Sequence, residues 1–168
     1  MAVAAWLTMG TTAPAQAPAV AAPSPAAAAP SKGRLVQHVT GMFDVKLTPQ
    51  PASEDPGRAD LGRMIIDKQY HGSLDGTGKG EMLTGMTAIK GSGAYVAIER
   101  VSGTLAGKHG TFILQHHATM TRGKPDLNIS VVPDSGTGDL TGISGRMGVR
   151  LENGQHFYDF AFSLGHAQ

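Results

Sequence analysis

Apolar residues alternate with polar ones along this chain, and from Leu35 onward the period is two residues. A period of two is typical of a β-strand whose two faces meet different surroundings, whereas a helix shows a period of 3.6. The runs with this alternation are residues 42–48, 64–70, 94–101, 111–120, 127–131 and 156–164. No long stretch has a helical pattern, and residues 49–62 are expected to form a loop with at most a short helical turn. The pattern predicts an all-β protein.

Glycine marks the ends of these strands, and all but one of the 23 glycines lie at or after Gly33. A short pattern, Gly-x-Leu-x-Gly, recurs at residues 72–76, 103–107 and 138–142. We interpret it as a repeated hairpin unit, in which the leucine plugs the end of the sheet and a glycine adopts the positive φ of a tight turn. Such repetition predicts a meander of antiparallel strands.

A sheet of about eight strands without a covering helix has to protect its edges from pairing with other chains. Closure into a barrel removes the edges, and a sandwich of two sheets is the alternative. We therefore expect residues 34–168 to form a single antiparallel up-and-down β-barrel of about eight strands. Because only 5% of the residues are aromatic, Ile, Leu, Val and Met are expected to fill the interior, which either is packed or holds one small ligand.

The first part of the chain has a different composition. Every Lys, Arg, Asp and Glu lies at or after Lys32, and the segment before it is rich in Ala and Pro. A short apolar stretch, Met1–Gly10, precedes Ala-x-Ala patterns at residues 13–15 and 15–17, although no basic residue precedes that stretch. Residues 1–17 are expected to be a signal peptide for export to the periplasm or beyond. The alternative is an uncleaved, disordered tail on a cytoplasmic protein, and residues 18–33 are an Ala/Pro-rich linker in either case.

Composition and charge exclude several kinds of protein. The formal net charge of +1 provides no basic surface for nucleic acid. The absence of Cys excludes disulfide scaffolds and Cys-ligated zinc or iron–sulfur sites. No uninterrupted apolar run is long enough for a transmembrane helix.

Several sequence blocks between Met64 and Leu164 resemble a bacterial family of uncharacterised proteins with an allene oxide cyclase-like barrel fold. These blocks are Gly80–Leu83, Gly93–Val101, Gly103–Leu105, Gly110–His116, Met120–Gly123, Val131–Gly138 and Tyr158–Phe160. The resemblance implies an antiparallel β-barrel, in agreement with the strand pattern. It implies no reaction, because fold alone does not determine function and no cyclase site is recognisable.

Polar residues within the apolar strands are the candidate functional residues. Glu99 shares a strand face with Tyr95, and His116 shares one with Leu114, so both are expected to point inward. A buried carboxylate near an imidazole could orient a ligand or transfer protons. The candidate ligand-binding residues are Glu81, Tyr95, Glu99, Gln115, His116 and Tyr158. If the strand faces the other way, Glu99 is solvated or pairs with Arg100 or Lys68 across the sheet.

Other motifs give weaker indications of a functional site. His116 and His117 are adjacent in a strand and point to opposite faces, so they cannot bind one metal ion together, and no metal site or cofactor is predicted. Residues 76–80 lack the order of a phosphate-binding loop, and Ser135 and Ser144 lack the elbow of a serine hydrolase. Residues 134–138 are expected to form a hairpin turn.

Three functions remain open from the sequence. The first is a β-barrel that binds a small apolar or amphipathic molecule and has no established reaction. The second is an isomerase- or cyclase-like enzyme that uses Glu99 and His116 inside the barrel. The third is a structural module that forms a homo-oligomer through its sheet faces.

Overall fold

The computed structural model describes residues 35–165. All described residues belong to one compact unit, Gly33–Gln168. The predicted signal peptide, residues 1–17, and the predicted linker, residues 18–33, lie outside the described residues.

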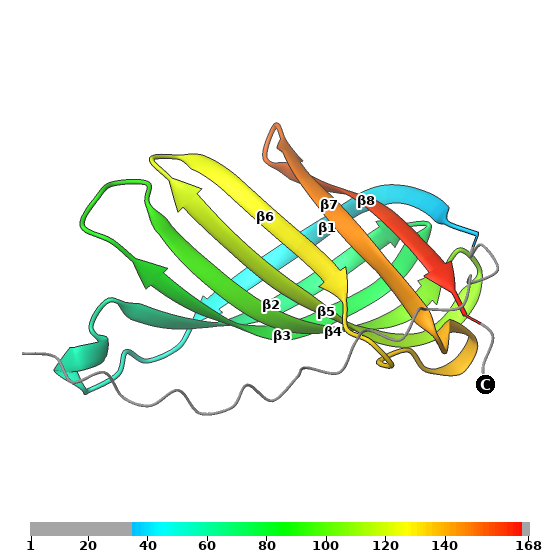
Figure 1. The fold of residues 1–168 in the computed structure, drawn as a ribbon, viewed down its shortest axis with the longest axis horizontal. Helices are drawn as coiled ribbons and strands as arrows, with labels where there is room; N and C mark the ends of the chain where they lie inside the picture. Colours follow the sequence, from blue (N-terminus) through cyan, green and yellow to red (C-terminus); the bar gives the residue numbers. More distant parts are fainter. Residues whose placement is uncertain (1–34, 166–168) are drawn as a thin grey trace, which may run out of the picture. The chain divides into compact units, whose positions relative to one another are not determined.

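Eight antiparallel strands form a closed barrel in which each strand pairs with the next and β8 pairs with β1 (Figure 1). This confirms the predicted all-β, up-and-down architecture. The strands are β1 (Gln37–Pro49), β2 (Leu61–Gly72), β3 (Leu74–Met86), β4 (Gly93–Leu105), β5 (Lys108–Thr121), β6 (Lys124–Val131), β7 (Ile143–Glu152) and β8 (Gln155–Leu164).

The helical content of residues 35–165 is limited to two 3-10 turns, η1 (Pro56–Arg58) and η2 (Gly138–Leu140). The first lies in the loop expected between β1 and β2, where Oδ1 of Asp55 accepts a hydrogen bond of 2.9 Å from the Gly57 amide. No helix in this part of the chain is long and apolar enough to cross a membrane.

One end of the barrel is closed by the leucines of the repeated glycine pattern. The β2–β3, β4–β5 and β6–β7 connections meet at this end (Figure 1). Leu74, Leu105 and Leu140 belong to these connections, and each is at most 1% exposed. The interpretation of the pattern as a turn with a plugging leucine is therefore confirmed. We call this the closed end, and the end that carries loop 87–92 and turn 122–123 the open end.

The packed core next to the closed end is more aromatic than the composition suggested. Phe112 and Phe160 stack with ring centroids 5.8 Å apart, and Phe160 and Phe162 are 5.3 Å apart. The buried aromatic residues are Phe43, Tyr70, Phe112, Tyr158, Phe160 and Phe162. Ile, Leu and Val share the core as expected, but Met147 is the only buried methionine among the described residues. Few aromatic rings suffice because most of the buried ones gather in this half of the barrel.

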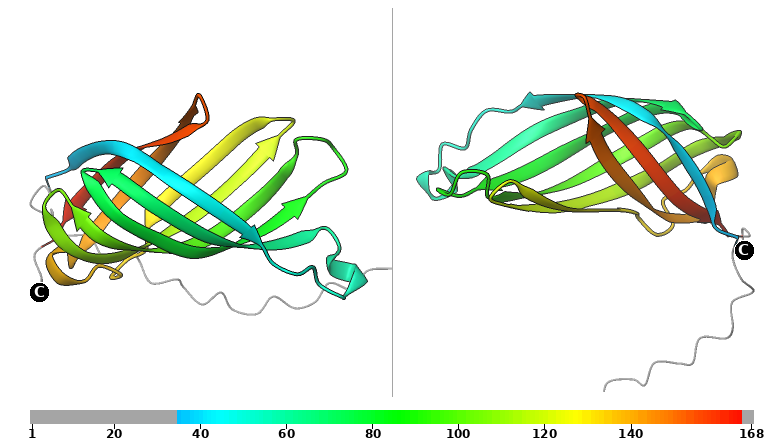
Figure 2. Two further views of the ribbon diagram at one scale, coloured as in Figure 1. Left: turned by 180° about the vertical axis from the view of Figure 1, so that it is seen from behind. Right: turned by 90° about the horizontal axis from the view of Figure 1, so that it is seen from above.

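The barrel wall is incomplete between β6 and β7. These strands share a single register pair, Ser130 with Arg146, whereas every other neighbouring pair is aligned over several residues. Figures 1 and 2 show the β5–β6 and β7–β8 hairpins diverging from this point toward the open end. We call the space between residues 124–129 and 147–152 the seam.

Candidate functional site

A cluster of charged and polar side chains lies inside the barrel at the level where the packed core ends. At its centre is the Glu99 side chain on β4, which is 0% exposed. Oε2 of Glu99 accepts a hydrogen bond of 2.7 Å from Nζ of Lys68, and Oε1 accepts one of 2.8 Å from the Tyr70 hydroxyl. Both partners lie on β2, two residues apart, so they face the interior together.

A glycine on the intervening strand makes this contact possible. β3 lies between β2 and β4, and its inward-facing Gly78 leaves the space through which Glu99 reaches Tyr70. A Cβ atom at position 78 would overlap Oε1 of Glu99 and lie 3.1 Å from Cε2 of Tyr70. Residues 74–80 are the first part of β3, and their glycines provide space for neighbouring atoms.

His116 on β5 completes the cluster and is only 4% exposed. Its Nε2 lies 3.1 Å from Oε2 of Glu99, which is an ion-pair distance. The geometry at this contact is unsuitable for a hydrogen bond, and no other described residue supplies a partner for Nε2. A buried ring nitrogen without a well-directed partner is costly, because its hydration is lost and not replaced.

The surroundings keep Glu99 charged. Burial alone would raise the pKa of its carboxyl, but the His116 imidazole and the Lys68 ammonium outweigh burial and lower the pKa to about 2. Burial and the negative charge of Glu99 raise the pKa of Tyr70 well above its usual value. The Tyr70 phenol therefore stays protonated and donates its hydrogen to the carboxylate.

The cluster forms the floor of a cavity of about 320 Å³ in the open half of the barrel. The cavity walls are apolar and include Phe43, Val45, Leu47, Ile66, Ile129 and Val149. Its polar lining consists mainly of Lys68, His116 and His156, and none of the described lining residues is acidic. Glu99 does not line the cavity, so an occupant would contact the Lys68 and His116 side chains and not the carboxylate.

A model of the family described as "Protein of unknown function (DUF3224)" matches residues 39–162, which is almost the whole barrel. The chain belongs to the DUF3224 family. It is also similar to the crystal structure of a DUF3224 protein of unknown function from Shewanella oneidensis MR-1, with 50% sequence identity and a TM-score of 0.74. That match covers 79% of this chain and 100% of the Shewanella chain. The search of curated proteins gave no match.

The DUF3224 membership confirms the resemblance to a bacterial family of uncharacterised proteins. The further likeness to allene oxide cyclases stays a prediction. Both descriptions give the function as unknown, so the activity of this DUF3224 barrel has to be argued from its own side chains.

Three of the residues singled out in the sequence lie at the cavity. Glu99 and His116 both point inward, and Tyr95 lines the cavity above them. Glu99 does pair with Lys68, but the pair is inside the barrel and not on its outer face. The sequence left open whether Glu99 and His116 face the interior, and in the structure both do.

The other three residues lie elsewhere. Tyr158 is buried near the closed end, where its hydroxyl accepts a hydrogen bond of 2.9 Å from the Leu74 amide and so stabilises the β2–β3 turn. Glu81 and Gln115 are exposed and line a groove on the outer face of the sheet. The structure does not bring these three residues to the interior cavity.

Tyr70 is a site residue that the sequence did not single out, and Lys68 was expected only as a partner of an outward-facing Glu99. The signal was present, because Lys68 is in phase with Ile66 and Tyr70 along an apolar run. A lysine in phase with buried neighbours needs a buried partner. Within residues 35–165, no group of three or more His, Asp or Glu side chains is arranged to hold a metal ion.

Proposed function

We propose that this DUF3224 protein binds a small amphipathic molecule in the interior cavity, with a carboxylate or carbonyl oxygen at Lys68 and His116. The observation that carries the proposal is an apolar cavity whose lining includes the Lys68 ammonium, which has one N–H left after its bonds to Glu99 and Tyr70, and the His116 imidazole. Ligand sites commonly combine apolar walls with a few convergent polar groups in this way.

The N–H donors at the floor of the cavity favour a ligand with an oxygen-bearing head group. An ammonium group has three hydrogens, and Lys68 directs two of them to Glu99 and to the Tyr70 hydroxyl, at 2.7 and 3.3 Å. One hydrogen remains. Nε2 of His116 has no well-directed partner. A carboxylate or carbonyl oxygen placed between these two nitrogens would satisfy both.

The apolar walls of the cavity favour a ligand whose remaining part is apolar. Transfer of methylene groups from water into such a cavity contributes about 0.8 kcal/mol per group. The volume of about 320 Å³ lies at the lower end of the range for small-molecule sites. The seam provides an entrance, since Leu127 and Leu151 line the cavity from β6 and β7 and remain 37% and 64% exposed.

Titration calorimetry with octanoate and octylamine tests the proposal, because the two probes share a tail and differ in the head group. We expect octanoate to bind and octylamine not to bind. Lys68→Met should weaken octanoate binding about tenfold or more, which is the value of a hydrogen bond to a charged group. His116→Gln should also weaken binding, and this variant keeps the Lys68–Glu99 pair.

Lys79→Met is the matched control. Lys79 lies on the outer face of β3, where it pairs with Asp67 at 2.7 Å and is 73% exposed. Its replacement should leave octanoate binding unchanged. Equal binding of octylamine and octanoate, or equal loss in the Lys68 and Lys79 variants, would contradict the proposed head-group site.

The contact between His116 and Glu99 favours a second candidate function, an isomerase that moves a proton on a bound carbonyl compound. His116 would take the proton from the carbon next to the carbonyl, and the electron pair of that C–H bond would form an enolate. Return of a proton from the imidazolium to the enolate would complete the isomerisation. Lys68 would donate a hydrogen bond to the enolate oxygen, and the Glu99 carboxylate would stabilise the resulting imidazolium.

Deuterium incorporation into 2-octanone tests this second candidate. In D₂O, the protein should accelerate exchange at the carbons next to the carbonyl, and proton NMR follows the loss of their signals. His116→Gln should abolish the acceleration, and Lys79→Met should retain it. Binding of 2-octanone without exchange would leave the barrel as a binding protein only.

A further inference from the structure

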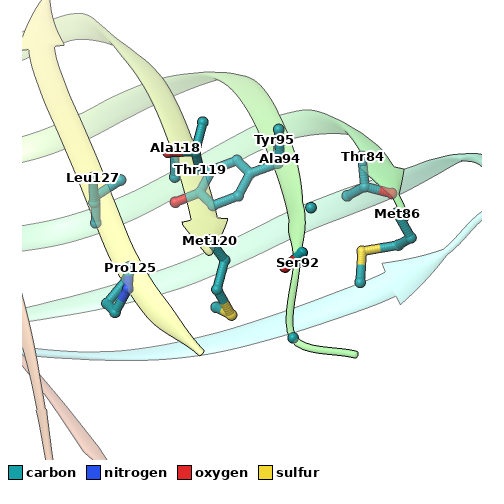
Figure 3. Close-up of a pocket in the computed structure, with 12 residues that line it drawn as sticks. Thr84, Met86, Ser92, Ala94, Tyr95, Ala118, Thr119, Met120, Pro125 and Leu127 are labelled. Atoms are coloured by element: carbon teal, nitrogen blue, oxygen red, sulfur yellow. The ribbon is translucent and has the colours of Figure 1, made fainter. Parts of the chain in front are cut away.

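A second pocket of about 260 Å³ lies at the open end of the barrel, next to the interior cavity (Figure 3). Its lining comes from the ends of β3 to β6 and includes Met86, Tyr95, Ala118, Met120, Pro125 and Leu127. We call it the rim pocket. Most of this lining is hydrocarbon and thioether, so the pocket suits an apolar group and offers little to a charged one.

The outer wall of the rim pocket is fastened by hydrogen bonds. The Gly123 amide donates to the Gly91 carbonyl at 2.8 Å, and the Arg122 amide donates to Oγ of Ser92 at 3.0 Å. These bonds tie loop 87–92 to turn 122–123. The polar groups of the loop are thereby used within the protein, and the pocket is a formed feature of the barrel end.

Tyr95 separates the rim pocket from the interior cavity. Tyr95, Pro125 and Leu127 line both spaces, and in Figure 3 the Tyr95 ring extends from β4 toward Ala118 on β5. Ala118 is the register partner of Tyr95 and has a small side chain. The two spaces therefore adjoin, with one aromatic ring and one methyl group between them.

We propose that the rim pocket receives the far end of a straight apolar chain whose oxygen-bearing head lies at Lys68 and His116. The inference rests on the proposed function and defines its ligand as a medium-chain acyl or alkyl compound. His116 and Met120 are four residues apart on β5, a span of roughly 13 Å at the rise of a strand. An extended hydrocarbon advances about 1.25 Å per carbon, given a C–C bond of about 1.5 Å, so about ten carbons fill the path.

Calorimetric titration of the full chain with hexanoate, octanoate, decanoate and dodecanoate, below their micelle concentrations, tests the inference. In the wild-type protein each added methylene should tighten Kd about fourfold until the chain reaches the rim pocket's outer end. Met120→Trp fills the pocket at a position that is 45% exposed and so should fold. This variant should weaken decanoate binding tenfold or more and leave hexanoate binding unchanged.

Leu83→Trp is the control, because Leu83 is 58% exposed and lines the outer groove of the sheet. The substitution adds a tryptophan side chain outside the barrel and should leave the Kd of every acid unchanged. Tyr95→Ala removes the ring between the two spaces and should allow a cyclohexyl-ended acid to bind more tightly than it binds to the wild-type protein.

The outcomes separate the two proposals. If Met120→Trp weakens hexanoate and decanoate equally, or neither, the rim pocket does not receive the chain, and the head-group site stands on its own test. If affinity stops rising at hexanoate, the chain does not pass Tyr95 and the inference is overturned. If no acid of any length binds, the proposed function fails, and the inference fails with it.

Discussion

Glu99 illustrates at the residue scale how the barrel holds a charge away from water. Burial removes water from its carboxylate and replaces that water with contacts to Lys68, Tyr70 and His116. This exchange is favourable only while all three contacts are kept. The ammonium group of Lys68 also lies 4.7 Å from the centre of the Phe43 ring, a favourable cation–π distance. The cluster thus stabilises the fold only when all its members are present, because loss of one charged member leaves another charge buried without a partner.

Glu99→Gln should therefore destabilise the protein by about 3–5 kcal/mol, the usual cost of breaking a buried ion pair. The loss arises mainly because Lys68 remains charged and buried. Urea unfolding followed by circular dichroism measures it. Glu81→Gln is the matched control, since Glu81 is exposed on the neighbouring strand, and it should change stability by less than about 0.5 kcal/mol. Equal effects of the two substitutions would contradict the burial of the charge.

The same carboxylate should make stability depend on acid pH. Its pKa in the folded protein, about 2, is below the ordinary value of 4.5. A lowered carboxyl pKa means that the unfolded chain takes up the proton first. The stabilisation is therefore complete above about pH 4.5 and is lost as pH falls toward 2.

Within this window the slope due to Glu99 should be about 1.4 kcal/mol per pH unit, and urea midpoints measured at several pH values would show it. Glu99→Gln should reduce the slope. Asp67, whose pKa is lowered by the hydrogen bond and charge of Lys79, acts in the same direction. It lies on the surface, so high salt screens its contribution. An unchanged slope in the Glu99 variant would contradict the lowered pKa.

At the scale of elements, β3 is the strand on which the site depends without contributing a charged group to it. Gly78 faces inward between Lys68 and Glu99, and the neighbouring Gly76 and Gly80 let the strand approach β4 closely. Glycine weakens an isolated strand. Its repeated use here is explained by the space that neighbouring backbone and the Glu99 carboxylate occupy.

Gly78→Ala should accordingly destabilise the barrel by about 2–4 kcal/mol, through overlap with Glu99 and loss of its bond to Tyr70. Gly85→Ala on the same strand is the control, because its added Cβ would lie 3.6 Å from the nearest atom, Cδ2 of Leu61. Urea unfolding compares them. The effect of Gly78→Ala should shrink in a Glu99→Ala background, and full additivity would contradict the steric explanation.

The strand pattern of the sequence predicted most elements and the inward-facing Glu99 and His116, but not a Lys68–Glu99 pair inside the barrel. Runs such as 111–120 and 156–164 alternate cleanly, so β5 and β8 followed from a period of two. The sequence did not indicate β3 because glycine at the inward positions 76, 78 and 80 removes the apolar half of the alternation. β7 has one inward glycine, Gly145, in an otherwise regular alternation, so its pattern was available in the sequence. The pairing of Lys68 with Glu99 depends on the register across β3, and no single strand contains that information.

At the scale of the whole barrel, residues 35–165 combine a packed half with a hollow half. Aromatic rings and the leucines of the repeated pattern fill the closed end, whereas the open end contains the interior cavity and the rim pocket. The charged cluster lies at the boundary. The barrel thus combines a well-packed closed end with an open end that has little internal packing. The seam lies at the open end.

Amide hydrogen exchange should show this division. The amides of β6 and β7 that face the seam, in residues 124–129 and 147–152, have no ladder partner across it, since these strands share only the pair Ser130–Arg146. We expect them to exchange at rates approaching those of an unstructured peptide, while central amides of β4 and β5 exchange only through global unfolding. Mass spectrometry of peptic fragments or NMR distinguishes the two groups. The β7–β8 ladder, which is continuous from Ile143 to Glu152, provides the internal control, because β8 amides directed to β7 should be protected. Uniform protection around the barrel would mean that β6 and β7 are paired in solution, and ligands would then have to enter from the open end alone.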